Sequence, residues 1–397
     1  MGKIAIEYDK YMKNRDVISF FSGAMGLDIG LSQAGLNVVI GQDFDANCVE
    51  TMRANGHNVL EGDIRNIKPE NVLELTGLHI GEPFMICGGP PCQPFSTAGK
   101  RLGINDPRGS LFMDFIRMID YIHPRFFVME NVKGIMSAPL KNMETSKKCP
   151  NQGLGTVLDI ILSEFNKLGY KTVYGILDAV NYGAPQFRER FVLIGSRDGE
   201  DIFLPLPTHF QMHQNPELRW HTIGDVLKDL DEDEPGEYVS LGEDRKKYLH
   251  MVPEGGNWRD LPQDIIPVAM GGAFESGGGK VGFYRRLSFS QPAPTITTSP
   301  AQKATMLGHP TKDRVLSLRE YARIQQFPDD WIFMGNLAAK YRQIGNAVPV
   351  GLGEAIGKAI VAVADNNAMV STKRFRGTAV HRKIKRAIEL GGTDYGN

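Results

Sequence analysis

One loop carries the most distinctive chemistry of the chain. Its sequence, GGPPCQPFS at residues 88–96, directly follows an apolar run that ends at Cys87. Because glycine and proline extend neither a strand nor a helix here, the segment is predicted to be a rigid loop. Cys92, at its centre, is then held outside regular structure, where a thiol can lose its proton more readily and act as a nucleophile. Cys87 is instead expected to be a small buried hydrophobic residue.

A carboxylate follows another apolar run. Phe126–Met129 reads as a buried strand, and Glu130 comes directly after it. An ionised carboxylate beside such a run is costly, so Glu130 should either be paired or be shifted towards a form that can donate a proton. A proton donor near a thiol is a functional pairing, although a glutamate that only ties down a loop is the alternative.

Two arginines occupy alternate positions in QFRER, residues 186–190. In a strand Arg188 and Arg190 project from one face, where two guanidinium groups suit carbonyl or phosphate oxygens. The alternative is a surface strand in which Glu189 pairs with them. The presence of Cys92 and Glu130 favours the functional interpretation.

A glycine turn suggests a nucleoside cofactor. The segment FFSGAMG at residues 20–26 joins a predicted strand to a predicted helix, and Asp43 ends the next strand about where ribose hydroxyls are often held. Asp63 could accept a hydrogen bond from an adenine amino group or simply cap a turn. The full dinucleotide fingerprint is missing, so a tight strand-to-helix turn without a ligand is an equal alternative on these residues.

Short β-rich runs alternate with helical stretches, which predicts a mostly parallel α/β sheet with its ligands beyond the carboxyl ends of the strands. The predicted strands are Val17–Phe21, Val38–Gln42, Phe84–Cys87, Phe126–Met129, Lys171–Leu177 and Arg190–Gly195. The predicted helices include Gly26–Ala34, Leu111–Tyr121, Thr156–Leu168, one that Ser317 and Glu320 open as a capping box and Phe327-Pro328 ends, and Gly351–Ala364.

Charge and glycine content divide the chain. The formal net charge is −1, yet residues 217–244 hold ten acids, and residues 271–348 hold ten bases against five acids. One face could therefore be positive while the whole is neutral. The expected domains are residues 1–204 (catalytic and cofactor-binding), 205–315 (a smaller, loop-rich domain), 316–370 (a return to the first domain) and 371–397 (a basic tail).

Composition excludes several classes of protein. With 42% hydrophobic and 23% charged residues, disorder, collagen and coiled coil are ruled out. Ala355–Ala364 is too short for a membrane span and is interrupted by Lys358, and Met1–Tyr11 lacks a secretory pattern. The four cysteines show no metal spacing. We therefore expect a soluble intracellular protein without a metal.

Taken together, the motifs resemble those of the DNA cytosine-5 methyltransferases, in family order and over residues 16–365. The matching segments are FSGAMG at 21–26, GDI at 62–64, GGPPCQPFS at 88–96, DPRGSLF at 106–112, ENV at 130–132, QFRER at 186–190, LREYARIQQFP at 318–328 and QIGNAVP at 343–349. The chain departs from the family where Met25 interrupts the usual glycines and Asp43 replaces a glutamate.

The resemblance implies S-adenosylmethionine as cofactor, cytosine in double-stranded DNA as substrate and a Rossmann-like methyltransferase fold with a target-recognition domain. It implies catalytic roles for Cys92, Glu130, Arg190 and, in support, Arg188. The implied cofactor-binding residues are Phe21, Ser22, Gly23, Gly26, Asp43, Phe44, Asp63, Ile64, Pro90, Leu111, Asn346, Ala347 and Val348. The expected DNA contacts are Ser96, Lys100, Arg101, Arg285 and Arg286, the first three in a lid that closes over a flipped base.

Three other functions compete with this one. A tRNA cytosine methyltransferase has the same catalytic motifs but a shorter recognition region and a Cys-Phe-Thr signature that this chain lacks. An inactive DNA-binding relative should have lost Cys92 or Glu130, and a nicotinamide-dependent oxidoreductase leaves PPCQ unexplained. We expect a cytoplasmic, nucleoid-associated monomer that modifies DNA in a restriction–modification system, with any cognate restriction endonuclease acting separately.

Overall fold

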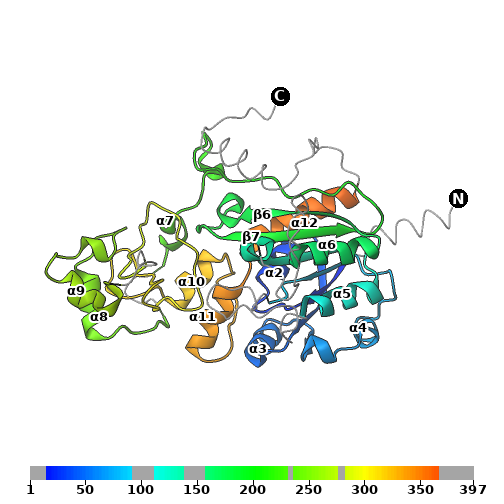
Figure 1. Cartoon of the computed structure of the whole chain (residues 1–397), viewed down its shortest axis with the longest axis horizontal. Coiled ribbons are helices and arrows are strands. Elements are labelled where there is room, and N and C mark those ends of the chain that lie inside the picture. Colours follow the sequence, from blue (N-terminus) through cyan, green and yellow to red (C-terminus); the bar gives the residue numbers. More distant parts are fainter. Residues whose placement is uncertain (1–14, 92–110, 138–156, 231–235, 276–281, 366–397) are drawn as a thin grey trace, which may run out of the picture. The chain divides into compact units, whose positions relative to one another are not determined.

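Apolar, β-branched runs pair into one sheet of seven strands in the order β3-β2-β1-β4-β5-β7-β6 (Figure 1). The computed structural model describes residues 15–91, 111–137, 157–230, 236–275 and 282–365. Strands β1 to β5 pair in parallel, whereas β7 runs antiparallel to β5. The strands are β1 (Asp16–Phe20), β2 (Asn37–Asp43), β3 (Val59–Glu61), β4 (Met85–Gly88), β5 (Phe126–Val132), β6 (Lys171–Asp178) and β7 (Glu189–Ser196).

The predicted fold class, a mostly parallel α/β sheet, is confirmed. All six predicted strands are present, with ends that differ by three residues at most. Strand β3 was not predicted because its three residues, two half-buried and one exposed, form no apolar run. The antiparallel direction of β7 follows from its connection, since the chain enters it from β6 without a crossover helix.

Helices α4, α5 and α6 bury one face of the sheet. The apolar residues of these helices form one continuous core with residues on the strands, which include Ile18, Phe20, Ile86 and Phe127. The stacked rings of Phe127 and Phe165 lie 3.9 Å apart within it. The helices in the described part of the chain are α2 (Gly26–Gln33), α3 (Ala46–Ala54), α4 (Pro69–Thr76), α5 (Leu111–Ile122), α6 (Val157–Lys167), α7 (Ile223–Leu227), α8 (Glu243–His250), α9 (Ile266–Met270), α10 (Leu318–Ile324), α11 (Leu337–Asn346) and α12 (Val350–Ala364).

Small residues bring α12 close to α2. A Cβ added at Gly353 would lie 2.7 Å from the carbonyl oxygen of Leu27, and one at Gly357 would lie 2.6 Å from the Cβ of Ala34. The ion pair between Arg15 and Asp365, 2.7 Å long, joins the start of β1 to the end of α12. Helix α12 therefore belongs to the same layer as the helix that follows β1.

The chain folds as two compact units. The first holds residues up to Leu177, Glu189–Leu206 and Gly353 onwards, and the second holds Asp178–Arg188 and Pro207–Leu352. The longer segment of the second unit runs from Pro207 to Leu352. The functional domains expected at residues 1–204, 205–315, 316–370 and 371–397 stay predictions.

The second unit holds the short helices α7 to α11 and a small core of its own, which includes Leu249, Ile266, Met306 and Val315. The predicted capping box of α10 is confirmed: the Ser317 hydroxyl accepts from the Glu320 amide, and the Glu320 carboxylate accepts from the Ser317 amide. The helix ends at Ile324, earlier than Phe327-Pro328.

One described run, Leu337–Ala364, is long and apolar enough to cross a membrane, because an 18-residue window within it has a mean hydropathy of 1.6. The run is two helices, α11 and α12, separated by residues 347–349, and 61% of that window is buried inside the protein. A buried core helix meets the same criterion, so this run is weak evidence for a membrane span.

Candidate active site

Strand β4 delivers the proline-rich loop to the carboxyl edge of the sheet. The strand ends at Gly88, and the loop is described as far as Pro91, so Cys92 lies outside the described residues. A Cβ added at Gly89 would lie 3.0 Å from Oε2 of Glu130. Glycine at this position therefore leaves room for a carboxylate from the neighbouring strand, three residues before the predicted nucleophile.

Glu130 is paired, one of the two states that its sequence context predicted. Its Oε1 lies 2.8 Å from Nε of Arg190, and the two side chains are only 13% and 12% exposed. Strands β5 and β7 pair antiparallel, with Glu130 opposite Val192 and Val132 opposite Arg190, so the pair is diagonal across neighbouring strands. The sheet thereby fixes a carboxylate and a guanidinium group at one edge, next to Gly89.

Asn131 contributes a contact that was not predicted. Its Nδ2 donates to the carbonyl oxygen of Pro90 at 2.9 Å, and its Oδ1 accepts from the amide of Val132 at 2.8 Å. The buried amide therefore ties β5 to the start of the proline-rich loop. An asparagine directly after a buried strand and an acid was the available signal.

The prediction that Arg188 projects beside Arg190 is wrong. Arg188 precedes β7, is 1% exposed and belongs to the second unit. Its guanidinium group donates to the carbonyl oxygens of Ile296 (2.9 Å) and Gly345 (2.6 Å). Buried carbonyls from distant segments hold this arginine, so its position indicates an organising role.

The glycine turn after β1 adopts the geometry that a close ligand requires. Phe21, Gly23 and Met25 all have positive φ, of 56°, 56° and 67°, and Gly26 begins α2. A Cβ added at Gly23 would meet no atom within 4 Å, so open space lies over the turn. Ser22 is half-buried, and its hydroxyl donates to that of Ser19 at 2.9 Å.

Asp43 is held rigidly at the end of β2. Its carboxylate accepts from the amides of Gly23 and Asp45, both at 2.9 Å, and burial raises its pKa above the ordinary value. The ring of Phe44 beside it is 68% exposed. An anchored acceptor next to an exposed aromatic ring and open space fits a ribose and a flat base, as S-adenosylmethionine carries.

Gln42 links two segments that are predicted to bind the cofactor, residues 21–26 and residues 62–64. It was not itself predicted as a site residue. Its side chain accepts from the amide of Phe21 at 3.2 Å and donates to the carbonyl oxygen of Gly62 at 2.6 Å. A polar residue near the end of an apolar strand was the signal. Asp63, which follows Gly62, pairs with Arg65, and this pairing lowers the pKa of Asp63. Ile64 is buried.

The remaining predicted cofactor residues are divided between the two units. Pro90 is buried and Leu111 half-buried in the first unit. In the second unit, Asn346 is the last residue of α11 and is exposed, and the following residues Ala347 and Val348 are half-buried and buried. Among the described residues, no group of three or more histidine, cysteine or acidic side chains could hold a metal ion.

Of the five predicted DNA contacts, Ser96, Lys100 and Arg101 lie outside the described residues. Arg285 is half-buried, and burial lowers its pKa.

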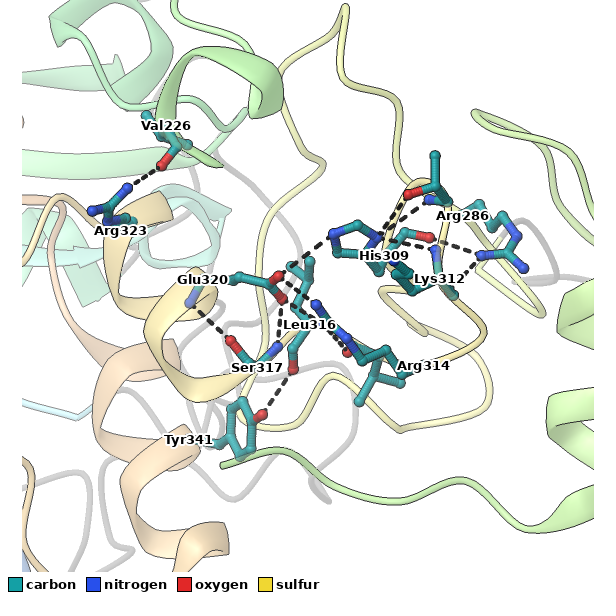
Figure 2. A network of polar contacts seen from close by, with 12 residues as sticks. Val226, Arg286, His309, Lys312, Arg314, Leu316, Ser317, Glu320, Arg323 and Tyr341 are labelled. Carbon is teal, nitrogen blue, oxygen red and sulfur yellow. Dashed lines mark hydrogen bonds and ion pairs between the residues drawn. The ribbon is translucent and has the colours of Figure 1, made fainter. Parts of the chain in front are cut away.

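The prediction for Arg286 is wrong. The side chain is 4% exposed, and Figure 2 shows its guanidinium group among backbone carbonyls of the second unit. It donates to the carbonyl oxygens of Val252 (2.7 Å), His309 (3.0 Å) and Lys312 (2.6 Å) and pairs with Asp313.

The chain resembles known methyltransferases over most of its length. The family model for C-5 cytosine-specific DNA methylase matches residues 15–362. The chain is 40% identical to the type II methyltransferase M.Sau96I of Staphylococcus aureus, over 90% of this chain and 78% of that protein. It is 42% identical to the type II methyltransferase M.PspPI of a Psychrobacter species, over 88% and 79%.

Solved structures show the same fold. A protein described as a DNA modification methyltransferase encoded within an E. coli prophage matches with a TM-score of 0.61 at 23% identity, covering 88% of this chain and 99% of that one. A methyltransferase of Entamoeba histolytica matches with a TM-score of 0.56 at 17% identity, covering 88% and 98%. With the family model spanning nearly the whole described chain, this protein belongs to the C-5 cytosine-specific DNA methylases, which use S-adenosylmethionine.

Proposed function

We propose that this chain methylates one cytosine within a specific double-stranded DNA sequence and serves as the modification enzyme of a restriction–modification system. The Glu130–Arg190 pair beside Gly89 carries the proposal, because it places an acid and a cation at the loop that leads to Cys92. The resemblance of the chain to type II methyltransferases supports a role in a restriction–modification system. The cytoplasm and its DNA are then the place of action.

The reaction begins with the thiolate of Cys92, which forms a bond to carbon 6 of the cytosine ring. Glu130 supports this addition by hydrogen bonding or proton donation at ring nitrogen 3, which turns carbon 5 into an enamine carbon. Arg190 holds the exocyclic oxygen of the base and fixes the orientation of Glu130, 2.8 Å away. After methyl transfer, solvent takes the carbon 5 proton, and release of the Cys92 thiolate with return of the nitrogen 3 proton to Glu130 completes the cycle.

When bound, S-adenosylmethionine would supply a methyl group on a positively charged sulfur, and transfer of that group to carbon 5 would release S-adenosylhomocysteine. In this chain the anchored carboxylate of Asp43 would hold the ribose hydroxyls, and the exposed ring of Phe44 would stack on the adenine. Asn346, Ala347 and Val348 are further proposed cofactor contacts, by the family resemblance. A stacked cytosine is out of reach of such a site, so the base must be flipped out of the duplex, as methyltransferases of nucleic acids generally require.

The segment from about Pro205 to Thr311 is proposed to choose the DNA sequence, because the reactive motifs lie outside it. Exchanging it for the matching segment of a relative should move the methylated site. An active chimera that still methylates the original sequence contradicts this assignment. We also propose that the protein acts as a monomer and that a cognate endonuclease, where present, acts separately.

Bisulfite sequencing of DNA from cells that express the protein tests the proposed function. The expected result is methylation of carbon 5 at one cytosine of one recurring sequence, absent with Cys92→Ser. Modification of transfer RNA with unmodified DNA would instead favour a tRNA methyltransferase. Binding of DNA without methylation of either nucleic acid would indicate an inactive relative.

A further inference from the structure

Two glutamines at the end of α10 surround the segment that links α11 to α12. Gln325 is fully buried, and its Nε2 donates to the carbonyl oxygens of Ile344 (2.6 Å) and Ala347 (2.9 Å). Its own backbone carbonyl accepts from the amide of Val350 at 3.1 Å. Gln325 therefore forms hydrogen bonds to the linking segment on both sides of residues 348–349.

Gln326 adds a contact at the cost of backbone strain. Its φ is 67°, in the left-handed region where glycine is the favoured residue at a helix end. The side chain explains why glycine is absent, since its Oε1 accepts from the amide of Gly351 at 2.9 Å. Glycine would relax the backbone here and lose this acceptor.

Buried side chains hold Gln325 and the end of α11 in turn. Gln186 donates to Oε1 of Gln325 at 2.7 Å, and Arg188 donates to the carbonyl oxygen of Gly345 at 2.6 Å. The approach at Gly345 is so close that an added Cβ would lie 2.1 Å from the carbonyl oxygen of Thr297. Few alternative positions are therefore open to residues 344–351.

We propose that Gln325 and Gln326, supported by Arg188, are positioning residues that hold Asn346–Val348 in the conformation that binds the cofactor. This inference rests on the proposed function, in which that segment contacts S-adenosylmethionine. When a contact segment is correctly placed for only part of the time, the apparent affinity falls by that fraction. We call Gln325 and Gln326 the clamp. Loss of the clamp should therefore weaken cofactor binding while the rate at saturating cofactor stays near normal.

The variants Gln325→Met and Gln326→Gly test the clamp in the full chain. Each removes contacts of an amide side chain, and we expect the dissociation constant of S-adenosylhomocysteine, measured by calorimetry, to rise roughly tenfold in each. The Michaelis constant for S-adenosylmethionine should rise in parallel, with the turnover number changed by less than about threefold. Because glycine relieves the positive φ, Gln326→Gly should melt at or above the wild-type temperature despite weaker binding.

Tyr341→Phe is the matched control. It removes a buried hydrogen bond of α11, from the tyrosine hydroxyl to the carbonyl oxygen of Leu316 at 2.8 Å (Figure 2), and leaves residues 347–349 untouched. Its cofactor affinity should stay within about twofold of wild type. An equal loss in this control, or a folded Gln326→Gly with wild-type affinity, would overturn the clamp.

Asn346→Ala separates this inference from the proposed function. If Asn346→Ala weakens cofactor binding and neither glutamine variant does, the clamp is wrong and the cofactor site stands. If Asn346→Ala, Ala347→Glu and Val348→Ala all bind the cofactor normally, the assignment of the segment to the cofactor fails first, and the clamp fails with it.

Discussion

The carboxylate of Glu130 can be replaced by an amide with almost no change of shape. Glu130→Gln keeps an oxygen that can accept from Nε of Arg190, which lies 2.8 Å from Oε1 in the wild type. The amide can still donate a hydrogen bond, but it cannot transfer a proton. The variant therefore removes the acid chemistry while it keeps most of the local packing.

Two magnitudes separate the chemical role from the structural one. The hydrogen bond to Arg190 loses its charge on one side, and since both side chains are about one-eighth exposed, we expect a loss of roughly 1 kcal/mol in the free energy of unfolding. General acid assistance is worth roughly a hundred- to ten-thousandfold in rate, equivalent to about 3–5 kcal/mol in activation free energy. The catalytic loss should therefore exceed the stability loss clearly.

The assay follows tritium release from DNA labelled at carbon 5, together with methyl incorporation, at saturating DNA and cofactor. Because Glu130 acts in the addition step, before methyl transfer, both signals should fall together. Glu200→Gln is the control, since Glu200 forms an equally short pair with Nε of Arg125 (2.8 Å) and is 15% exposed. Its stability should change similarly and its turnover should not.

Near-normal tritium release from Glu130→Gln would refute the proposed role. A parallel fall in cofactor affinity and rate, matched by an equal loss of stability, would assign Glu130 to the structure of the loop. Loss of turnover in Glu200→Gln would show that the assay reports stability and not chemistry.

Three further predictions address the nucleophile, the cofactor and a buried acid. Cys92→Ser should abolish methyl transfer with DNA binding intact, and the wild type alone should form a denaturant-resistant adduct with DNA that carries 5-fluorocytosine; methylation without that adduct speaks against covalent catalysis. Phe44→Ala should weaken cofactor binding by roughly five- to tenfold with little change in stability, since the ring is 68% exposed, and unchanged calorimetric affinity contradicts the proposed stacking. Burial raises the pKa of Asp28 from 3.8 to about 6, so its ionisation opposes folding, a penalty that is absent below about pH 4 and complete above about pH 6. Asp28→Asn should therefore raise the free energy of unfolding at pH 8 by up to about 3 kcal/mol and have little effect at pH 4. Urea unfolding measures this difference, and an equal effect at pH 8 and pH 4 contradicts the prediction.

Local sequence determined the elements and the motifs. Apolar runs such as Phe126–Met129 specify buried strands, and Ser317 with Glu320 specifies the start of a helix, because both signals depend on neighbours a few residues away. The order of the motifs is also read directly from the sequence, and the family and its chemistry follow from that order. The short strand β3 was missed because Val59–Glu61 carries no such signal.

Only the tertiary structure decided what each polar side chain contacts. Arg188 and Arg190 are two residues apart, yet Arg190 pairs with Glu130, whereas Arg188 binds the carbonyl oxygen of Gly345, 157 residues along the chain. Arg286 is likewise held by carbonyls of distant segments and not exposed for DNA. A polar group that is buried must find a partner, and that partner is set by which segments the fold brings together, which a local pattern does not record.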